Sequence, residues 1–357
     1  MISVLFFNTI AVFFAWLESS GRYKHGLKLS LFTVFLFLAL RYDYGNDYMG
    51  YLNFFLNQSA SKFANVYNYA FEPGWDFLNL LFKPFGFFAM QAMLAVATCI
   101  VLYRFIKIYC PIKYYWFAVF YYVFQPFQML VLSSAMRQAV AGLLFILAID
   151  FILKKKVIRY LIIIFIATLF HKTAFFLFPL ILLGFMKQRW SNIQTLLIIL
   201  VFFFIILMPD ILYNEITSLL TGDFSKYEVY TSSTVSLRLG IGWLLMIIIN
   251  LFIILNARFA KTISEILLFK IAILSFIVYQ LIFVVPLVTR LTFYLNPVLM
   301  VVFPFVFLKI KSKGTKLSYM FLVVIFIISQ FYLFFLPTNW GEHFGVYKTI
   351  FSAPSFY

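Results

Sequence analysis

The chain has 357 residues, of which 64% are hydrophobic and 11% charged, and its formal net charge is +16. Soluble domains hold about 45–50% apolar and about 25% charged residues, so a soluble fold of this length is excluded. The basic residues are scattered through short connections between apolar runs, which argues against nucleic acid as a partner.

Continuous apolar runs predict an all-α polytopic membrane protein, because helices satisfy their own backbone hydrogen bonds in lipid. A template of about 20 residues per span gives about twelve transmembrane helices in one domain over residues 1–357. The N-terminus has no basic region and no clear cleavage site, so it is expected to stay as the first span. The expected spans are residues 2–17, 28–41, 86–106, 113–132, 136–153, 157–170, 173–186, 192–208, 238–256, 264–285, 291–308 and 317–336.

Lysine and arginine give the expected orientation. Alternate connections hold 19 of the 28 basic residues, and that side is expected to be cytoplasmic. The outer side then has the three longest connections, about 41–76, 209–237 and the tail 337–357, and nine of the twelve acids. Acids do little to set topology, so their excess favours a polar site on the outer face. The short inner connections contain nothing like a nucleotide-binding loop.

The first candidate cluster lies in the connection 41–76. Arg41, Asp43, Asp47 and Glu72 could bind sugar hydroxyls, serve as a general base or hold a divalent cation. The alternative is an interfacial aromatic belt with solvated charges. No ligand spacing demands a metal, and Cys99 and Cys110 match neither a disulfide framework nor a metal site. The aromatic residues expected to bind sugar faces here are Tyr48, Tyr51 and Trp75.

The second cluster is Arg137 with Gln138, at the tight turn between two expected spans. A guanidinium beside the free N–H groups of a helix start suits an oxyanion such as pyrophosphate, and Gln138 adds a neutral donor. The alternative is that Arg137 extends to lipid headgroups.

His171 lies midway between two basic, inner connections. Each arm has only about 13–15 residues and reaches roughly 20 Å, which is short of a roughly 30 Å hydrocarbon core. His171 is therefore expected at the apex of a hairpin in the outer half of the membrane, where an ionisable residue indicates function. A satisfied structural histidine is the alternative.

Arg290 begins another expected span at its outer end, and Tyr294 follows one helical turn later on the same face. The pair could hold a second phosphate or an anionic sugar. An ordinary flanking arginine is the alternative.

These motifs resemble the EpsG-type branch of the Wzy polysaccharide polymerases. The resemblance runs over most of the chain in the same order, and the Arg137-Gln138 and His171 motifs are its most specific parts. It rests on Arg41-x-Asp43-x-Gly45-x-Asp47-Tyr48-x-x-Tyr51, Glu72-Pro73-Gly74, Met136-Arg137-Gln138-Ala-Val-Ala141, Phe170-His171-Lys-Thr173-Ala174 and Arg290-x-x-x-Tyr294.

The resemblance implies polymerisation of undecaprenyl-pyrophosphate-linked repeat units at the periplasmic face of a bacterial inner membrane. It also implies a fold similar to GT-C-type glycosyltransferases, no cofactor, and a Wzz-like chain-length regulator as a further partner. In this chemistry Arg137, Arg290 and Arg41 are expected to bind pyrophosphate. Proton transfer is expected from His171, Asp43 or Glu72, which the sequence does not rank.

Three other functions stay open. An O-antigen ligase uses the same carrier with a different acceptor. A flippase or transporter is disfavoured because spans such as 192–208 and 317–336 hold no charge. A membrane-bound O-acyltransferase also pairs a histidine with many spans, but it draws acyl-CoA from the cytoplasm, where no site is evident.

Overall fold

A computed structural model describes residues 1–58, 72–186, 191–207, 240–281, 288–338 and 340–353. Helices dominate these ranges, as predicted. The chain forms two compact units, and the first combines Met1–Gly184 with Ile327–Tyr357. The second unit is Phe185–Phe326. The predicted outer connection 209–237 lies wholly outside the described residues, and the prediction of a single membrane domain stays a prediction.

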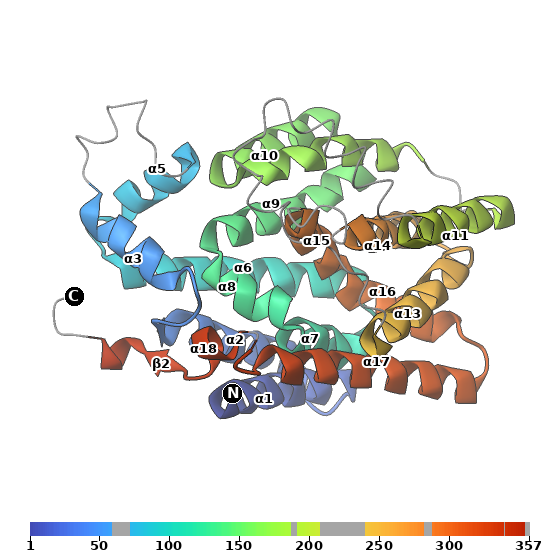
Figure 1. Cartoon of the computed structure of the whole chain (residues 1–357), viewed down its shortest axis with the longest axis horizontal. Coiled ribbons are helices and arrows are strands. Elements are labelled where there is room, and N and C mark those ends of the chain that lie inside the picture. Colours follow the sequence, from blue (N-terminus) through green and yellow to red (C-terminus); the bar gives the residue numbers. More distant parts are fainter. Residues whose placement is uncertain (59–71, 187–190, 208–239, 282–287, 339, 354–357) are drawn as a thin grey trace. The chain divides into compact units, whose positions relative to one another are not determined.

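The first unit is built on helices from its N-terminal half that pack side by side. Helix α1 packs against α2 and α7, and α2 packs against α6 (Figure 1). Gly26 makes the α1–α2 contact close, because a Cβ atom there would lie 2.2 Å from the carbonyl oxygen of Phe14. The bounds are α1 (Ile2–Ser19), α2 (Gly26–Leu40), α6 (Phe87–Tyr109) and α7 (Tyr115–Phe124).

The span predicted over residues 113–132 is not one straight helix. Ile112–Phe124 and Phe127–Ser134 meet at an angle of 67°. Pro126 lies at this bend and lacks the N–H that would continue a helix. A π-helical turn η2 (Phe127–Val131) and α8 (Leu132–Ser134) follow, so the chain turns before α9 begins. A short 3-10 turn, η1 (Ile112–Tyr114), precedes α7.

The predicted hairpin around His171 is confirmed. Helix α9 (Met136–Leu153) is followed by α10 (Val157–Phe170), and the 3-10 helix η3 (Lys172–Gly184) returns alongside α10. His171 is the residue between the two arms. Gly184 lets η3 approach α9 closely, since a Cβ atom there would lie 2.5 Å from the carbonyl oxygen of Ile152.

Short elements cover one end of these helices. Strand β1 (Arg41–Tyr42) pairs antiparallel with β2 (Lys348–Thr349), so the tail returns to the first predicted outer connection. The N-terminal amine donates to the carbonyl of Gly345 over 2.6 Å, which puts the start of α1 at the same end. The remaining elements here are α3 (Tyr48–Asn57), α5 (Pro73–Phe82), α18 (Gly341–Phe344) and η8 (Ile350–Ser352).

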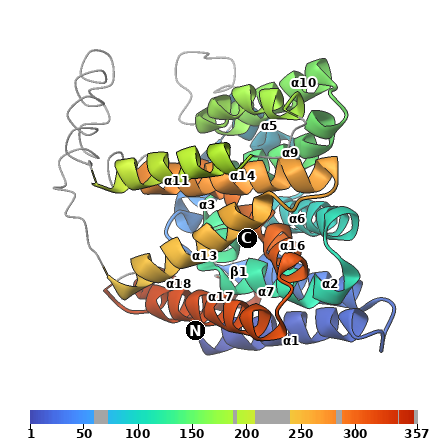
Figure 2. The ribbon, with the colours of Figure 1, turned by 90° about the vertical axis from the view of Figure 1, so that its right-hand side faces the viewer.

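In the second unit, α14 packs against α11, α13, α15 and α16 (Figure 2). The Thr262 side chain accepts from the Glu265 N–H and so caps α14. The Tyr319 hydroxyl of α17 donates to the carbonyl of Ile249 over 3.0 Å. The bounds are α11 (Asn192–Leu207), α13 (Ile241–Ala257), α14 (Ile263–Gln280), α15 (Thr289–Leu295), η7 (Asn296–Val298), α16 (Leu299–Lys309) and α17 (Lys313–Phe334), which runs on into the first unit at Ile327.

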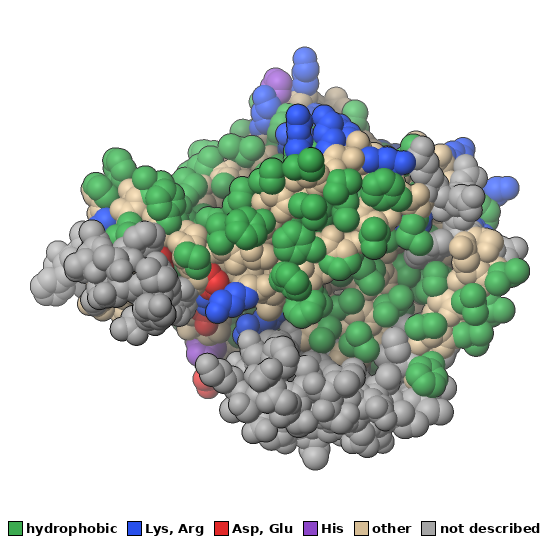
Figure 3. Space-filling view, turned by 90° about the horizontal axis from the view of Figure 1, so that it is seen from above, with side chains coloured by type: hydrophobic (Ala, Val, Ile, Leu, Met, Phe, Trp, Pro, Cys, Tyr) green, Lys and Arg blue, Asp and Glu red, His purple; other side chains and the backbone are tan. Residues whose placement is uncertain are grey.

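Six helices in the described residues are long and apolar enough to cross a membrane, or seven if the bent pair is one span. Shorter apolar helices such as α2 and α10 account for other predicted spans. Hydrophobic side chains cover much of the surface in Figure 3, and lysine and arginine side chains gather toward one edge of that face. The protein is therefore a multi-pass α-helical membrane protein, while the count of twelve spans and the likeness to GT-C enzymes stay predictions.

Candidate functional site

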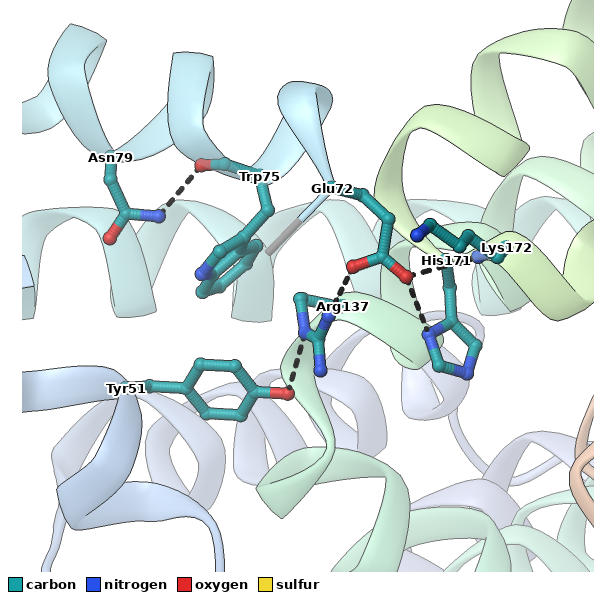
Figure 4. Close-up of polar contacts among 7 residues, drawn as sticks. All are labelled: Tyr51, Glu72, Trp75, Asn79, Arg137, His171 and Lys172. Carbon is teal, nitrogen blue, oxygen red and sulfur yellow. Dashed lines mark hydrogen bonds and ion pairs between the residues drawn. The ribbon is translucent and has the colours of Figure 1, made fainter. Parts of the chain in front are cut away.

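Glu72 lies at the centre of a polar cluster formed by four separate elements (Figure 4). We call Tyr51, Glu72, Arg137 and His171, with the backbone N–H of Lys172, the Glu72 cluster. Tyr51 comes from α3, Glu72 precedes α5, Arg137 lies in the first turn of α9, and His171 ends α10. Arg137, predicted to bind pyrophosphate, and His171, predicted to transfer a proton, therefore meet at the Glu72 carboxylate, and Tyr51 contacts Arg137.

The local sequence explains why Glu72 reaches the hairpin. Glu72 has an extended backbone at the N-cap of α5, and Pro73 fits the first helical position because that position needs no N–H donor. Gly74 then brings α5 against α10, since a Cβ atom there would lie 2.7 Å from the carbonyl oxygen of Leu169. A larger residue at Gly74 would hold Glu72 away from His171.

The Glu72 carboxylate has three partners. Arg137 Nη1 donates to Oε2, the Lys172 N–H donates to Oε1 over 3.1 Å, and His171 Nδ1 lies 3.6 Å from Oε1. Burial alone would raise the pKa of Glu72, but the His171 contact, the Arg137 charge and the Lys172 N–H outweigh burial and lower that pKa to about 2. An acid this strong is a poor proton acceptor, so Glu72 is suited to hold Arg137 and His171 in place.

Arg137 links the cluster to the aromatic residues of the predicted sugar site. Its Nε donates to the Tyr51 hydroxyl over 3.2 Å, and the guanidinium carbon lies 5.8 Å from the centre of the Tyr51 ring. The Tyr51 ring in turn contacts Trp75, with ring centres 5.1 Å apart. The predicted pyrophosphate-binding Arg137 is thus adjacent to two residues predicted to bind sugar.

Three buried ring nitrogens near the cluster have no hydrogen-bond partner among the described residues. They are Trp75 Nε1, His171 Nε2 and His171 Nδ1, and the last of these lies 3.6 Å from the Glu72 carboxylate. Buried polar atoms are normally paired, so such atoms indicate a place for a polar ligand. With Nδ1 directed at Glu72, Nε2 is the atom of His171 that a substrate oxygen can approach.

Arg41 and its neighbours have a different environment. The Arg41 side chain is 3% exposed and donates to the carbonyl groups of Leu38 and, over 2.9 Å, Ser133. The Tyr48 hydroxyl donates to the Arg41 carbonyl, and the Asp47 N–H donates to the Ser134 hydroxyl. These contacts tie the end of α2 to the bend before α9. The predicted pyrophosphate role of Arg41 and the predicted sugar contacts of Asp47 and Tyr48 stay predictions.

Asp43, Gln138, Arg290 and Tyr294 complete the set of predicted site residues. Asp43 has a left-handed backbone, with φ 44°, and pairs with Lys348 of β2 over 2.6 Å at a half-exposed position. Gln138 follows Arg137 in the chain, and its side chain is buried. Arg290 and the buried Tyr294 both lie in α15 of the second unit. Their predicted roles, and the meeting of Arg290 with Arg137, stay predictions.

Sequence reasoning missed Asp76 and Asn79. They follow Glu72 at intervals of four and seven residues, which places all three on one face of α5. This spacing was the available signal. In the ranges that the structure describes, no three His, Cys, Asp or Glu side chains gather as metal ligands would.

The fold and the site define a multi-pass helical membrane protein with a buried charged cluster at one end of its helices. A sequence model of the EpsG family matches residues 27–348, so the chain belongs to the EpsG family. This confirms the resemblance, and it indicates a polysaccharide polymerase of glycosyltransferase type. No curated protein and no solved structure gives a significant match to the chain.

Proposed function

We propose that this protein joins undecaprenyl-pyrophosphate-linked oligosaccharide repeat units into O-antigen, capsular or exopolysaccharide. The growing chain passes from its carrier to the terminal sugar of an incoming unit, and lipid pyrophosphate is the leaving group. The reaction takes place at the periplasmic or outer face of the bacterial inner membrane. Both lipid-linked substrates bind from the bilayer, and a Wzz-like regulator sets the chain length.

The Glu72 cluster is the observation that carries this proposal. Negative charge grows on the leaving pyrophosphate as the glycosidic bond breaks, and a fixed guanidinium stabilises it without reorganisation. Arg137 is already held in place by Glu72 and Tyr51, and its side chain remains 20% exposed. His171 Nε2 adds a second, buried polar contact for a phosphate oxygen.

The distribution of charges in the first unit supports the proposed face. The Glu72 cluster lies where α9 begins and α10 ends, whereas the exposed Lys154, Lys155 and Lys156 lie where α9 ends and α10 begins. Exposed lysines at span ends are typical of the cytoplasmic side. This distribution supports our proposal that the cluster faces the opposite side, where lipid-linked units would be polymerised.

Deletion of the gene in the producing strain tests the proposal. Gel analysis of the surface glycan should show single repeat units in place of a ladder, and plasmid-borne wild-type protein should restore the ladder. Full-length polymer that stays on the lipid carrier would instead indicate a ligase. Complete loss of surface glycan, with repeat units accumulating at the cytoplasmic face, would indicate a flippase. Either result would overturn polymerisation.

A further inference from the structure

Helix α5 has its polar side chains inside and its apolar side chains outside. Trp75, Asp76 and Asn79 are at most 3% exposed, whereas Phe77 and Leu81 on the other face are 58% and 53% exposed. A helix beside lipid exposes apolar residues at no cost, but burying a carboxylate and an amide is unfavourable unless they are paired. The inward face of α5 is therefore built for polar contacts.

Those contacts are incomplete within the described chain. Asp76 Oδ1, Asn79 Oδ1, Gln58 Oε1 and Trp75 Nε1 are all buried without a hydrogen-bond partner among the described residues. The side-chain NH2 groups of the two amides already have partners. Asn79 donates to the Trp75 carbonyl over 2.7 Å, and Gln58 donates to the Asp76 carbonyl over 3.3 Å. This leaves three oxygen acceptors and one N–H donor, a set that matches a ligand with many hydroxyl groups.

We propose that Asp76 is the catalytic base, which takes the proton from the attacking hydroxyl of the acceptor sugar. This inference rests on the proposed function. The acceptor O–H bond breaks, its proton moves to an oxygen of Asp76, and the hydroxyl oxygen forms the new bond to the anomeric carbon of the donor. The bond from that carbon to pyrophosphate breaks, and its electron pair leaves with the lipid pyrophosphate. Asn79 and Gln58 accept hydrogen bonds from neighbouring hydroxyls, and Trp75 contacts the sugar.

Electrostatics separates the roles of the two carboxylates. Burial and the nearby Glu72 charge raise the pKa of Asp76 to about 6, although Arg137 opposes this shift. A base whose pKa lies just below the working pH is deprotonated there and still binds a proton strongly, which Glu72, with a pKa of about 2, does not. Glu72 and Asp76 lie one helical turn apart and thus have different roles: Glu72 stays an anion, and Asp76 accepts the proton.

Among the described residues, the charged groups that act on Asp76 are Glu72 and Arg137. Glu72 precedes it on the same helix, Arg137 comes from α9, and His171 reaches Glu72 from the end of α10. Gln58, at the end of α3, is neutral. A pH profile that Asp76 controls must therefore be separated from one that His171 controls.

The test uses purified full-length protein and lipid-linked repeat units extracted from the deletion strain. Wild-type polymerisation should fall as the pH is lowered through about 6. Asp76→Asn should be at least about 100-fold slower at pH 7.5 and should lose that fall, because it has no group to protonate. His171→Gln should be slower but should keep the fall near pH 6. Glu342→Gln, an exposed acid in α18, is the matched control and should match wild type.

The outcomes separate the two proposals. If wild-type protein forms no polymer from these units, the proposed function itself fails. If wild type polymerises and Asp76→Asn keeps at least half its rate with the same pH profile, only the role of Asp76 fails. If Asp76→Asn accumulates poorly, Asp76→Glu is measured in its place. A shift in the pH at which its polymerisation rate falls supports the role of Asp76, and an unchanged pH overturns it.

Discussion

Ion pairs occur at both ends of the helices in the first unit, and their environments differ. At the predicted inner end, Glu18 pairs with Lys107 over 2.8 Å and Asp150 pairs with Arg104 over 2.5 Å. The basic partners are 36% and 55% exposed. The acids themselves are largely buried, with 9% of the Glu18 side chain and 13% of the Asp150 side chain exposed, so water competes mainly for the basic partners. Pairs with one exposed partner contribute about 1 kcal/mol or less. Such pairs are typical of the ends of membrane spans, where a basic side chain neutralises an acid at the interface.

At the predicted outer end, Glu72 is 8% exposed and is shared by Arg137 and His171. Burying these charges is costly, and the pair is retained although an apolar replacement would often be more stable. The neighbouring Asp76 and Trp75 add buried atoms without partners in the described residues. The comparison teaches that incomplete pairing of buried polar atoms, more than the presence or burial of a charge, distinguishes the proposed functional end from the other end.

The largest effect is expected from removing Arg137 from the Glu72 cluster. Arg137→Ala should reduce polymerisation by at least about 100-fold, because a preorganised charge on the leaving group is lost. Arg137→Lys should recover only part of this, since an ammonium cannot contact Glu72, Tyr51 and phosphate in the same fork. Gel analysis of glycan length, with immunoblots for protein level, measures both. Normal chain length in Arg137→Ala would remove Arg137 from the site.

Glu72→Gln should cost both stability and activity. Removing one partner of a buried ion pair costs about 3–5 kcal/mol. The folded pKa of Glu72, about 2, lies below its ordinary 4.5, so its stabilisation is complete above pH 4.5 and is lost as the pH falls toward 2. Thermal unfolding in detergent should therefore separate wild type from Glu72→Gln at neutral pH, and the gap should close between pH 4.5 and 2. A constant gap over this range would contradict the assigned ionisation.

Gly74→Ala tests whether the close approach of α5 to α10 positions Glu72, and it alters no charge. The added Cβ would meet the Leu169 carbonyl at 2.7 Å, so α5 must shift away from α10. We expect a loss of about 1–3 kcal/mol from overpacking and lower activity as Glu72 moves from His171. Gly50→Ala is the matched control, because nothing lies within 4 Å of its added Cβ. Equal activity of the two variants would show that the α5–α10 approach does not position the cluster.

Arg104→Ala should have the smallest effect. Arg104 is 55% exposed, and Asp150 keeps its hydrogen bond from the Tyr109 hydroxyl, so we expect a change of at most about 1 kcal/mol and unchanged glycan length. Melting temperature and gel analysis measure these quantities. A loss of polymer as large as that of Arg137→Ala would mean that the two ends do not differ as their burial indicates.

The sequence by itself determined the helical membrane class and the hairpin around His171. An apolar run partitions into lipid whatever its tertiary contacts are, so the helical membrane class followed from the composition. The lengths of the two arms around His171 likewise predicted the hairpin, because the rise per residue fixes how far each arm reaches.

Only the tertiary structure decided which charges share one environment. Sequence reasoning ranked Asp43 and Glu72 together, yet Asp43 pairs with Lys348 near the surface and Glu72 is buried between Arg137 and His171. It also missed Asp76, because the inward direction of a polar helix face depends on which distant helices pack beside it. The pKa of a carboxylate and the partners of a guanidinium are set by these long-range contacts, which hydropathy and spacing along one chain do not encode.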